Sequence, residues 1–152
     1  MQVEVKTFEE LGVEELYKLL QLRSEIFVVE QECLFLDLDD KDQSALHVLG
    51  WEGQELAAYA RIFGPGDSFK EASIGRVAVR ERFRGAGLGM QVMKESIRAA
   101  KRRFGPINIA LSAQKYLRQF YTDLGFTAEG KEYTEDGIPH IRMVLYGETR
   151  DQ

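Results

Sequence analysis

A glycine-rich junction between a strand and a helix restricts the fold of this sequence more than any other feature. Residues 84–89 read Arg-Gly-Ala-Gly-Leu-Gly, between a strand expected over 72–79 and a helix expected over 88–104. The first amides of a helix have no acceptor within it and lie at the positive end of its dipole, so they can bind an anion. Glycine, without a Cβ, lets the backbone approach a phosphate oxygen. The junction therefore predicts a phosphate-binding loop in an α/β fold.

Two common phosphate-binding motifs do not fit this loop. A nucleotide P-loop needs Gly-Lys-Ser/Thr, whereas Met90 follows Gly89. A dinucleotide-binding loop needs the spacing G-x-G-x-x-G and an acid about twenty residues later, whereas the spacing here is G-x-G-x-G and residue 109 is Ile109. Two alternatives remain: the pattern Arg-x-x-Gly-x-Gly, which Arg84, Gly87 and Gly89 match, or a glycine-rich helix N-terminus without a ligand.

Hydrophobic periodicity predicts one mixed sheet covered by helices. The expected strands lie near residues 3–5, 46–51, 56–63, 72–79, 107–111, 127–133 and 140–146, and the expected helices near residues 16–27, 88–104 and 117–124. This order differs from regular βαβ units, so the pattern predicts an α/β fold of the mixed α+β kind and not a doubly wound sheet. Because no repeat or linker interrupts the chain, we expect residues 1–152 to form a single domain.

Composition restricts the class of protein and its surroundings. Cys33 is the only cysteine, which excludes an intramolecular disulfide and a thiolate metal cluster and suits the reducing cytoplasm. The formal net charge of −5 disfavours nucleic acid as a partner, because phosphate attraction requires the opposite sign. No secretory signal opens the chain, and no apolar run approaches the ~20 residues of a membrane span. We therefore expect a cytoplasmic protein without metal or membrane contact, as a monomer or homodimer.

Charge is distributed unevenly along the chain. Two clusters stand out: Arg76, Arg80, Arg82 and Arg84 on one side, and Asp37, Asp39, Asp40 and Asp42 on the other. The basic cluster could bind a small anion, or both clusters could simply be solvated loops.

Two motifs in the same order resemble those of the GNAT superfamily of N-acetyltransferases. In that family a strand ending in hydrophobic-x-Val leads into Arg/Gln-x-x-Gly-x-Gly/Ala, and here residues 77–79 precede the glycine-rich loop. The family also carries Phe-Tyr-x-x-x-Gly-Phe at a later helix end, which residues 120–126 match. Gln114 stands where the family usually has Asn. Residues 27–31, the aspartate cluster, His47 and residues 137–140 further resemble the ElaA-like branch.

The resemblance implies a twisted mixed sheet that is split between the strand at 77–79 and the strand at 107–111. It implies acetyl-coenzyme A as co-substrate, no metal, and an amine of a small molecule or peptide as acceptor. The cofactor-binding residues that it implies are Val77, Ala78, Val79, Arg84, Gly85, Ala86, Gly87, Leu88, Gly89 and Gln114. Backbone groups of Val77 and Val79 would bind the thioester and pantetheine, and amides of residues 84–89 would bind the pyrophosphate. An unpaired strand edge can accept such an arm as an added strand.

The same resemblance implies that Tyr121 is the general acid that protonates the leaving thiolate. A tyrosine hydroxyl is protonated at neutral pH and can donate; the alternative is a core residue. Related enzymes often use a strand carboxylate as general base, but residues 73–76 supply none. The candidates elsewhere are Glu30, His47, His140 or a water molecule. Without an adjacent base, Cys33 is not expected to carry the acyl group.

Three expectations about function stay open at this point. The fold could hold acyl-coenzyme A as a non-catalytic sensor or interaction module, and an enzyme could transfer to oxygen or use a longer acyl group. The aspartates at 37–42 could form an acidic rim that attracts a cationic amine, or a solvated loop without contact to substrate.

Overall fold

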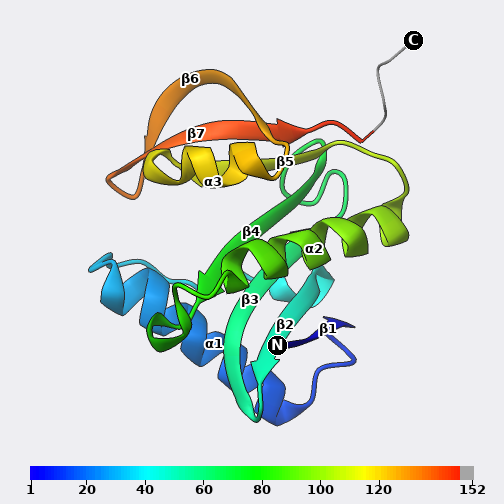
Figure 1. Cartoon of the computed structure of the whole chain (residues 1–152), viewed down its shortest axis with the longest axis vertical. Helices are drawn as coiled ribbons and strands as arrows, with labels where there is room; N and C mark the ends of the chain where they lie inside the picture. Colours follow the sequence, from blue (N-terminus) through cyan, green and yellow to red (C-terminus); the bar gives the residue numbers. More distant parts are fainter. Residues whose placement is uncertain (148–152) are drawn as a thin grey trace.

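The computed structural model describes residues 1–147 and consists of a seven-stranded mixed sheet flanked by helices (Figure 1). The strand order is β1-β2-β3-β4-β5-β7-β6. The strands are β1 (Gln2–Thr7), β2 (Leu46–Glu52), β3 (Glu55–Phe63), β4 (Ala72–Val79), β5 (Ile109–Gln114), β6 (Thr127–Glu135) and β7 (Ile138–Leu145). The α-helices are α1 (Val13–Arg23), α2 (Leu88–Phe104) and α3 (Arg118–Asp123). The predicted α/β fold with a mixed sheet is confirmed.

Helix α1 continues without a break into the π-helix Ser24–Glu30, which the periodicity of the sequence did not separate from it. Strand β6 runs on to Glu135 and β7 begins at Ile138, each two residues beyond the expected bounds. Strand β5 begins two residues later than expected and runs on to Gln114. This shift places Gln114 inside the sheet and not in the loop that follows it.

The sheet is split where its two parallel strands meet. Only two residue pairs join β4 to β5, Ala72 with Ile109 and Ser73 with Ala110, whereas all other neighbouring strands are antiparallel and pair over longer stretches. Beyond Ser73 the two strands diverge (Figure 1). The edge of β4 that would face β5 therefore pairs with no strand over 75–79, in the part of the chain that the structure describes. The predicted split is confirmed.

A β-bulge bends β4 at the mouth of the split. Tyr59 of β3 pairs with Ala78, but Arg61 pairs with Gly75, so β4 carries one residue more than β3 between the two pairs. Arg76, within the bulge, has a φ of 50°. A non-glycine residue in this left-handed region is uncommon and needs surrounding contacts to hold it.

The core lies on both faces of the central strands. Residues 56–63 of β3 are buried without interruption, because helices cover both faces of the sheet there. Alternate side chains point to opposite faces: Ala58 packs in one cluster with Val92 of α2, and Tyr59 packs in another with Leu22 of α1. Helix α3 packs on β5 and β6, at the far side of the split.

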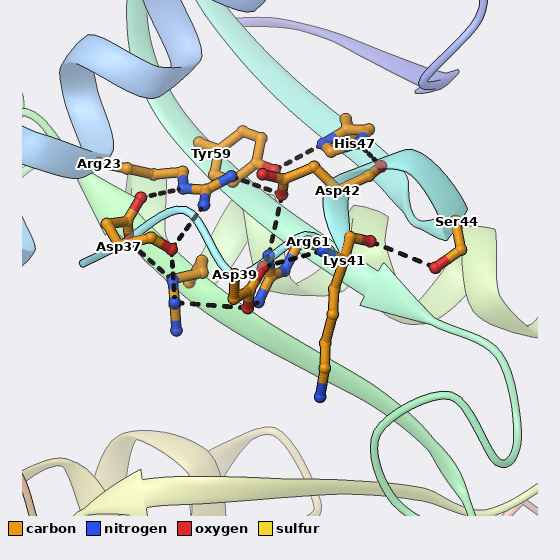
Figure 2. A network of polar contacts seen from close by, with 10 residues as sticks. Arg23, Asp37, Asp39, Lys41, Asp42, Ser44, His47, Tyr59 and Arg61 are labelled. Atoms are coloured by element: carbon orange, nitrogen blue, oxygen red, sulfur yellow. Dashed lines mark hydrogen bonds and ion pairs between the residues drawn. The ribbon is translucent and has the colours of Figure 1, made fainter.

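A network of buried ion pairs joins α1 and β3 to the segment that follows the π-helix (Figure 2). Arg23 is fully buried, and its guanidinium donates to Asp37 Oδ2 at 2.8 Å and to Asp42 Oδ1 at 2.7 Å. Arg61 donates to the same Asp42 oxygen at 2.9 Å and to Asp39 Oδ2 at 2.8 Å. Each of these two arginines therefore pairs with two carboxylates, and Asp42 lies between both cations.

Arg76 extends this network to the bulge of β4. Its Nε donates to Asp37 Oδ1 at 2.8 Å, so the Asp37 carboxylate joins α1 to the bulge. Asp37 and Asp42 are only 4% and 6% exposed. The expectation of an acidic rim open to a cationic acceptor is therefore wrong for these two and for Asp39, because arginines already compensate their charge. Asp40 alone of the four is exposed.

His47 belongs to the same buried region. Its Nδ1 lies 2.6 Å from the Tyr59 hydroxyl and its Nε2 lies 2.9 Å from the carbonyl oxygen of Asp42. Burial lowers the pKa of His47, although the hydrogen bond to Asp42 opposes part of this effect. With both ring nitrogens engaged and the side chain fully buried, His47 is part of the core and is not placed to accept a proton from a substrate.

The network predicts a large loss of stability when Asp42 is replaced. Asp42→Ala leaves two buried guanidinium groups without one of their carboxylates, and we expect the free energy of unfolding to fall by about 3–5 kcal/mol. Asp40→Asn, an exposed change in the same segment, should alter it by less than about 0.5 kcal/mol. Urea unfolding of both variants measures the difference, and equal stability of the two would contradict a structural role for the network.

The network also predicts acid sensitivity. Burial alone would raise the pKa of Asp39, but the hydrogen bonds from Arg61 outweigh it and lower that pKa to about 2. The unfolded value is about 3.9, so the stabilisation is complete above pH ~4 and is lost as the pH falls from there toward 2. Urea unfolding at pH 6, 4 and 3 should show this decline, and Asp39→Asn should be less stable at pH 6 but decline less. Parallel curves for the two proteins would argue against it.

Candidate functional site

A cavity of about 700 Å³ occupies the split between β4 and β5. Its walls come from the end of the π-helix, the bulged part of β4, the glycine-rich loop, the end of β5 and the β6–β7 hairpin. The predicted site residues that line it are Val77, Ala78, Val79, Arg84, Gly85, Gly87, Leu88, Gly89, Gln114 and Tyr121. Ala86 is the one predicted residue that does not line the cavity. The fold therefore brings together residues from strands and helices that lie far apart in the sequence.

Two glycines of the loop allow a backbone conformation that other residues rarely adopt. Gly85 and Gly87 have φ values of 89° and 80°, and a Cβ at either position would meet nothing within 4 Å. Gly89 has an ordinary conformation, and a Cβ there would lie 3.6 Å from Phe120 and Val79. The loop therefore turns through left-handed conformations that favour glycine, and it leaves open space above itself.

The residues that follow this loop, 88–90, line the cavity and have amides available to an anion. The first hydrogen bond of α2 runs from Gln91 N to Gly87 O at 3.1 Å, so the amides of 88–90 have no acceptor within the helix. The first turn of α2 contains no acidic side chain. The positive end of a helix of 17 residues thus lies beside the unpaired edge of β4.

Arg84 does not contribute a free positive charge to this site. Its two terminal nitrogens donate to the Glu30 carboxylate at 2.7 and 2.9 Å, and its Nε donates to the Val79 carbonyl at 2.9 Å. The hydrogen bonds that Arg84 donates to the Glu30 carboxylate raise the pKa of Arg84. Glu30, a candidate base, is therefore the bidentate partner of an arginine, and the pair connects the π-helix to the loop.

The other arginines of the expected basic cluster are paired as well. Arg80 donates to Glu25 at 2.7 Å, Arg82 contacts Glu55, and Arg76 belongs to the buried network. Positive potential for a bound anion would therefore come from helix amides and not from unpaired guanidinium groups.

Tyr121 combines a buried ring with an accessible hydroxyl. The residue is 7% exposed, and its ring packs edge-on against Phe120 and Phe126 with centroid distances of 5.0 and 5.9 Å. Within residues 1–147 the hydroxyl makes no hydrogen bond, although the side chain lines the cavity. Burial raises the pKa of Tyr121 to about 12. The hydroxyl is thus protonated at neutral pH and free to donate, whereas the ring is part of the core.

The wall opposite β4 contains two residues that sequence patterns did not single out, Ser112 and Glu135. Gln114 pairs with His140 across β5 and β7, and Ser112, Gln114, Glu135 and His140 all line the cavity. Of the three candidate bases, Glu30 and His140 line it, whereas His47 does not. Ser112 stands two residues before Gln114 in β5 and so shares its face. That spacing was the one signal for Ser112 in the sequence, and Glu135 had none before the strand register was known.

Neither a metal cluster nor a membrane span is found in the part of the chain that the structure describes. Over residues 1–147 no group of three His, Cys, Asp or Glu side chains could hold a metal ion. No helix among these residues is long and apolar enough to cross a membrane.

The whole fold matches solved structures of related proteins. An acyl-CoA N-acyltransferase from Pseudomonas aeruginosa has a crystal structure that matches with a TM-score of 0.90 at 39% identity, covering 95% of this chain and 98% of that one. The crystal structure of Escherichia coli ElaA matches with a TM-score of 0.89 at 40% identity and the same coverage. In a sequence comparison, Escherichia coli ElaA is 43% identical over 136 residues, which are 88% of this chain and 89% of ElaA.

Residues 5–146 also match the Acetyltransferase (GNAT) domain family. The fold and the cavity therefore define an acyltransferase of the kind that uses acyl-coenzyme A. The chain belongs to the GNAT acetyltransferase family.

Proposed function

We propose that this protein transfers the acetyl group of acetyl-coenzyme A to an amine of a small molecule or peptide. One observation supports the proposal above all others. The unpaired edge of β4, the free amides at the start of α2 and the unbonded hydroxyl of Tyr121 all face one cavity. Binding of an amide-containing arm, binding of a pyrophosphate and donation of a proton are thereby available at a single place.

The residues of the cavity fit the two ends of coenzyme A. The backbone of Val77, Ala78 and Val79 offers N–H and C=O groups to the pantetheine arm, which can lie against β4 as an added strand. The Arg84 amide already donates to the Glu81 carbonyl oxygen, so the amides of 85–89 are the ones that offer donors to the pyrophosphate. Gln114, at the end of β5, lies on the opposite wall, where its amide can reach the same arm.

Acyl transfer then requires charge stabilisation at two atoms. The acceptor nitrogen attacks the thioester carbon, and a backbone N–H near Val77 stabilises the oxyanion that develops. The C–S bond breaks as Tyr121 donates its hydroxyl proton to the leaving sulfur. Tyr121 suits this role as general acid because its hydroxyl stays protonated and has no competing acceptor among the described residues.

One prediction of the proposed function concerns the loop. Gly87→Glu places a carboxylate where the pyrophosphate is proposed to lie, and Gly87→Gln adds the same bulk and the same strain at a φ of 80° without the charge. By calorimetric titration with coenzyme A, the Glu variant should bind at least tenfold more weakly than the Gln variant, or ~1.4 kcal/mol. Circular dichroism checks that both variants fold. Equal affinity of the two would remove the loop from the pyrophosphate site.

Another prediction of the proposed function concerns Tyr121. Tyr121→Phe keeps the packed ring and removes the hydroxyl, so kcat for thiol release should fall by about 10²-fold while the affinity for acetyl-coenzyme A stays the same. Tyr116→Phe serves as control, because Tyr116 also lines the cavity but is 74% exposed. An unchanged rate for Tyr121→Phe would return this residue to a purely structural role. A wild-type protein that binds acetyl-coenzyme A but releases no thiol with any amine would instead be a sensor.

A further inference from the structure

One face of the outer three strands carries a group of polar side chains. His140 of β7 pairs with Gln114 of β5 on one side and with Tyr133 of β6 on the other, and Glu135 pairs with Ile138. Directly paired residues and residues two apart share a face of the sheet. The residues on this face that concern the site are Ser112, Gln114, Tyr133, Glu135, Ile138 and His140.

The opposite face of the same strands belongs to the hydrophobic core. Leu111, Ala113, Ile141 and Met143 alternate with the polar set and are buried in the cluster that contains Tyr121 of α3. The polar face therefore lies on the side of the sheet away from α3. The cavity is bounded from both sides, by Tyr121 on the α3 side and by the polar face on the other.

His140 is held in a defined orientation on this face. It is 6% exposed, and its Nδ1 lies 2.7 Å from the Ile138 carbonyl oxygen, which can only accept a hydrogen bond. Nδ1 therefore carries the hydrogen of the neutral ring, and Nε2 keeps its lone pair. The Tyr133 ring stacks on the imidazole with a centroid distance of 6.1 Å.

Glu135 lies beside this lone pair without using it. Its Oε2 is 3.8 Å from His140 Nε2, too far for a hydrogen bond, and its Oε1 accepts a hydrogen bond from Ser112 Oγ at 3.2 Å. Ser112 is in turn hydrogen-bonded to the Tyr133 hydroxyl. The hydrogen bond from Ser112 thus orients the Glu135 carboxylate through Oε1. Its Oε2 and the Nε2 of His140 lie 3.8 Å apart without a hydrogen bond between them.

Among the described residues that line the cavity, the charged side chains that lack an oppositely charged partner lie at its β6–β7 end and are negative. Arg84 is paired with Glu30, and Arg76 with Asp37. Glu135 and Asp136 also line the cavity, and within residues 1–147 neither has a lysine or arginine at ion-pair distance. The other titratable side chains that line it are Cys33, Tyr116 and Tyr121. A cation is therefore the ligand that this end of the cavity favours.

We propose that Glu135 and His140 form the acceptor site of the transferase proposed above, with Glu135 binding the ammonium group of a primary amine and His140 Nε2 accepting its proton. Phe27, Phe35 and Ile138 line the same cavity, so the acceptor is an amine with an apolar substituent and no carboxylate near its nitrogen. The inference depends on the proposed acyl transfer, and it supplies the base that β4 lacks.

The proton balance of the reaction follows from these positions. R–NH₃⁺ gives one proton to His140 Nε2, and the neutral amine forms the new C–N bond to the thioester carbon. The C–S bond breaks, and the sulfur takes the Tyr121 proton. The nitrogen then loses its second proton, which restores the Tyr121 hydroxyl through solvent, and His140 releases its own proton to solvent. The net change is R–NH₃⁺ plus acetyl-coenzyme A to the amide, the free thiol and one proton.

A binding experiment tests the Glu135 part without turnover. Protein saturated with coenzyme A is titrated with phenethylamine and, separately, with phenylacetate of opposite charge. We expect phenethylamine to bind and phenylacetate not to, and Glu135→Gln to weaken phenethylamine at least tenfold. Glu132→Gln is the matched control, because Glu132 lies on the same strand, pairs with Lys115 and does not line the cavity. Equal binding of both probes, no binding of phenethylamine, or an unaffected Glu135→Gln variant would overturn the proposal.

A kinetic experiment tests the His140 part. With phenethylamine as acceptor, His140→Gln should lower kcat for thiol release by about 10²-fold, while the affinities for coenzyme A and for phenethylamine stay unchanged. An unchanged kcat would make His140 a structural residue. Wild-type protein that fails to bind coenzyme A would contradict the proposed function, whereas coenzyme A binding without amine binding contradicts the acceptor site alone.

Discussion

The early end of the pairing between β4 and β5 is the constraint on which the rest of this structure depends. Two residue pairs join the strands, and beyond Ser73 each strand follows a different half of the sheet. In an uninterrupted sheet, the backbone groups of residues 75–79 would be satisfied by a neighbouring strand. Here they border a cavity, together with the start of α2 and the side chain of Tyr121. A separation of two strands thereby converts structural hydrogen-bonding groups into binding groups.

The buried ion pairs hold the parts that border this separation. Asp37 accepts hydrogen bonds from Arg23 of α1 and from Arg76, whose left-handed backbone lies within the bulge of β4. Apolar packing could stabilise such a contact equally well, but it does not specify direction, whereas paired guanidinium and carboxylate groups do. We interpret the network as the means by which α1 and the segment after the π-helix are kept in register with the bulge.

The cavity thus has two sides with different chemistry. On the side of α2 and α3 lie helix amides and a protonated hydroxyl, which suit an anionic co-substrate and a departing thiolate. On the other side, Glu135 and His140 face the opening without a compensating lysine or arginine among the described residues, which suits a cation. The division follows from the alternation of side chains along β5 and β7, since one residue in two faces each side.

The sequence by itself determined the elements of this protein and the loop at its centre. Strand and helix periodicity and the glycine-rich loop depend on neighbours along the chain. The predicted order of strands and helices agrees with the structure, although the bounds of several elements differ by a few residues. Only the tertiary structure decided which charged side chains are paired and where the two histidines lie. Asp37 and Arg76 are 39 residues apart, and nothing in either segment indicates the other. Whether a carboxylate is solvated or paired, and whether a histidine lies in the core or in a cavity, depends on which distant groups exclude water from it, and that is settled only when the strands pair and the helices pack.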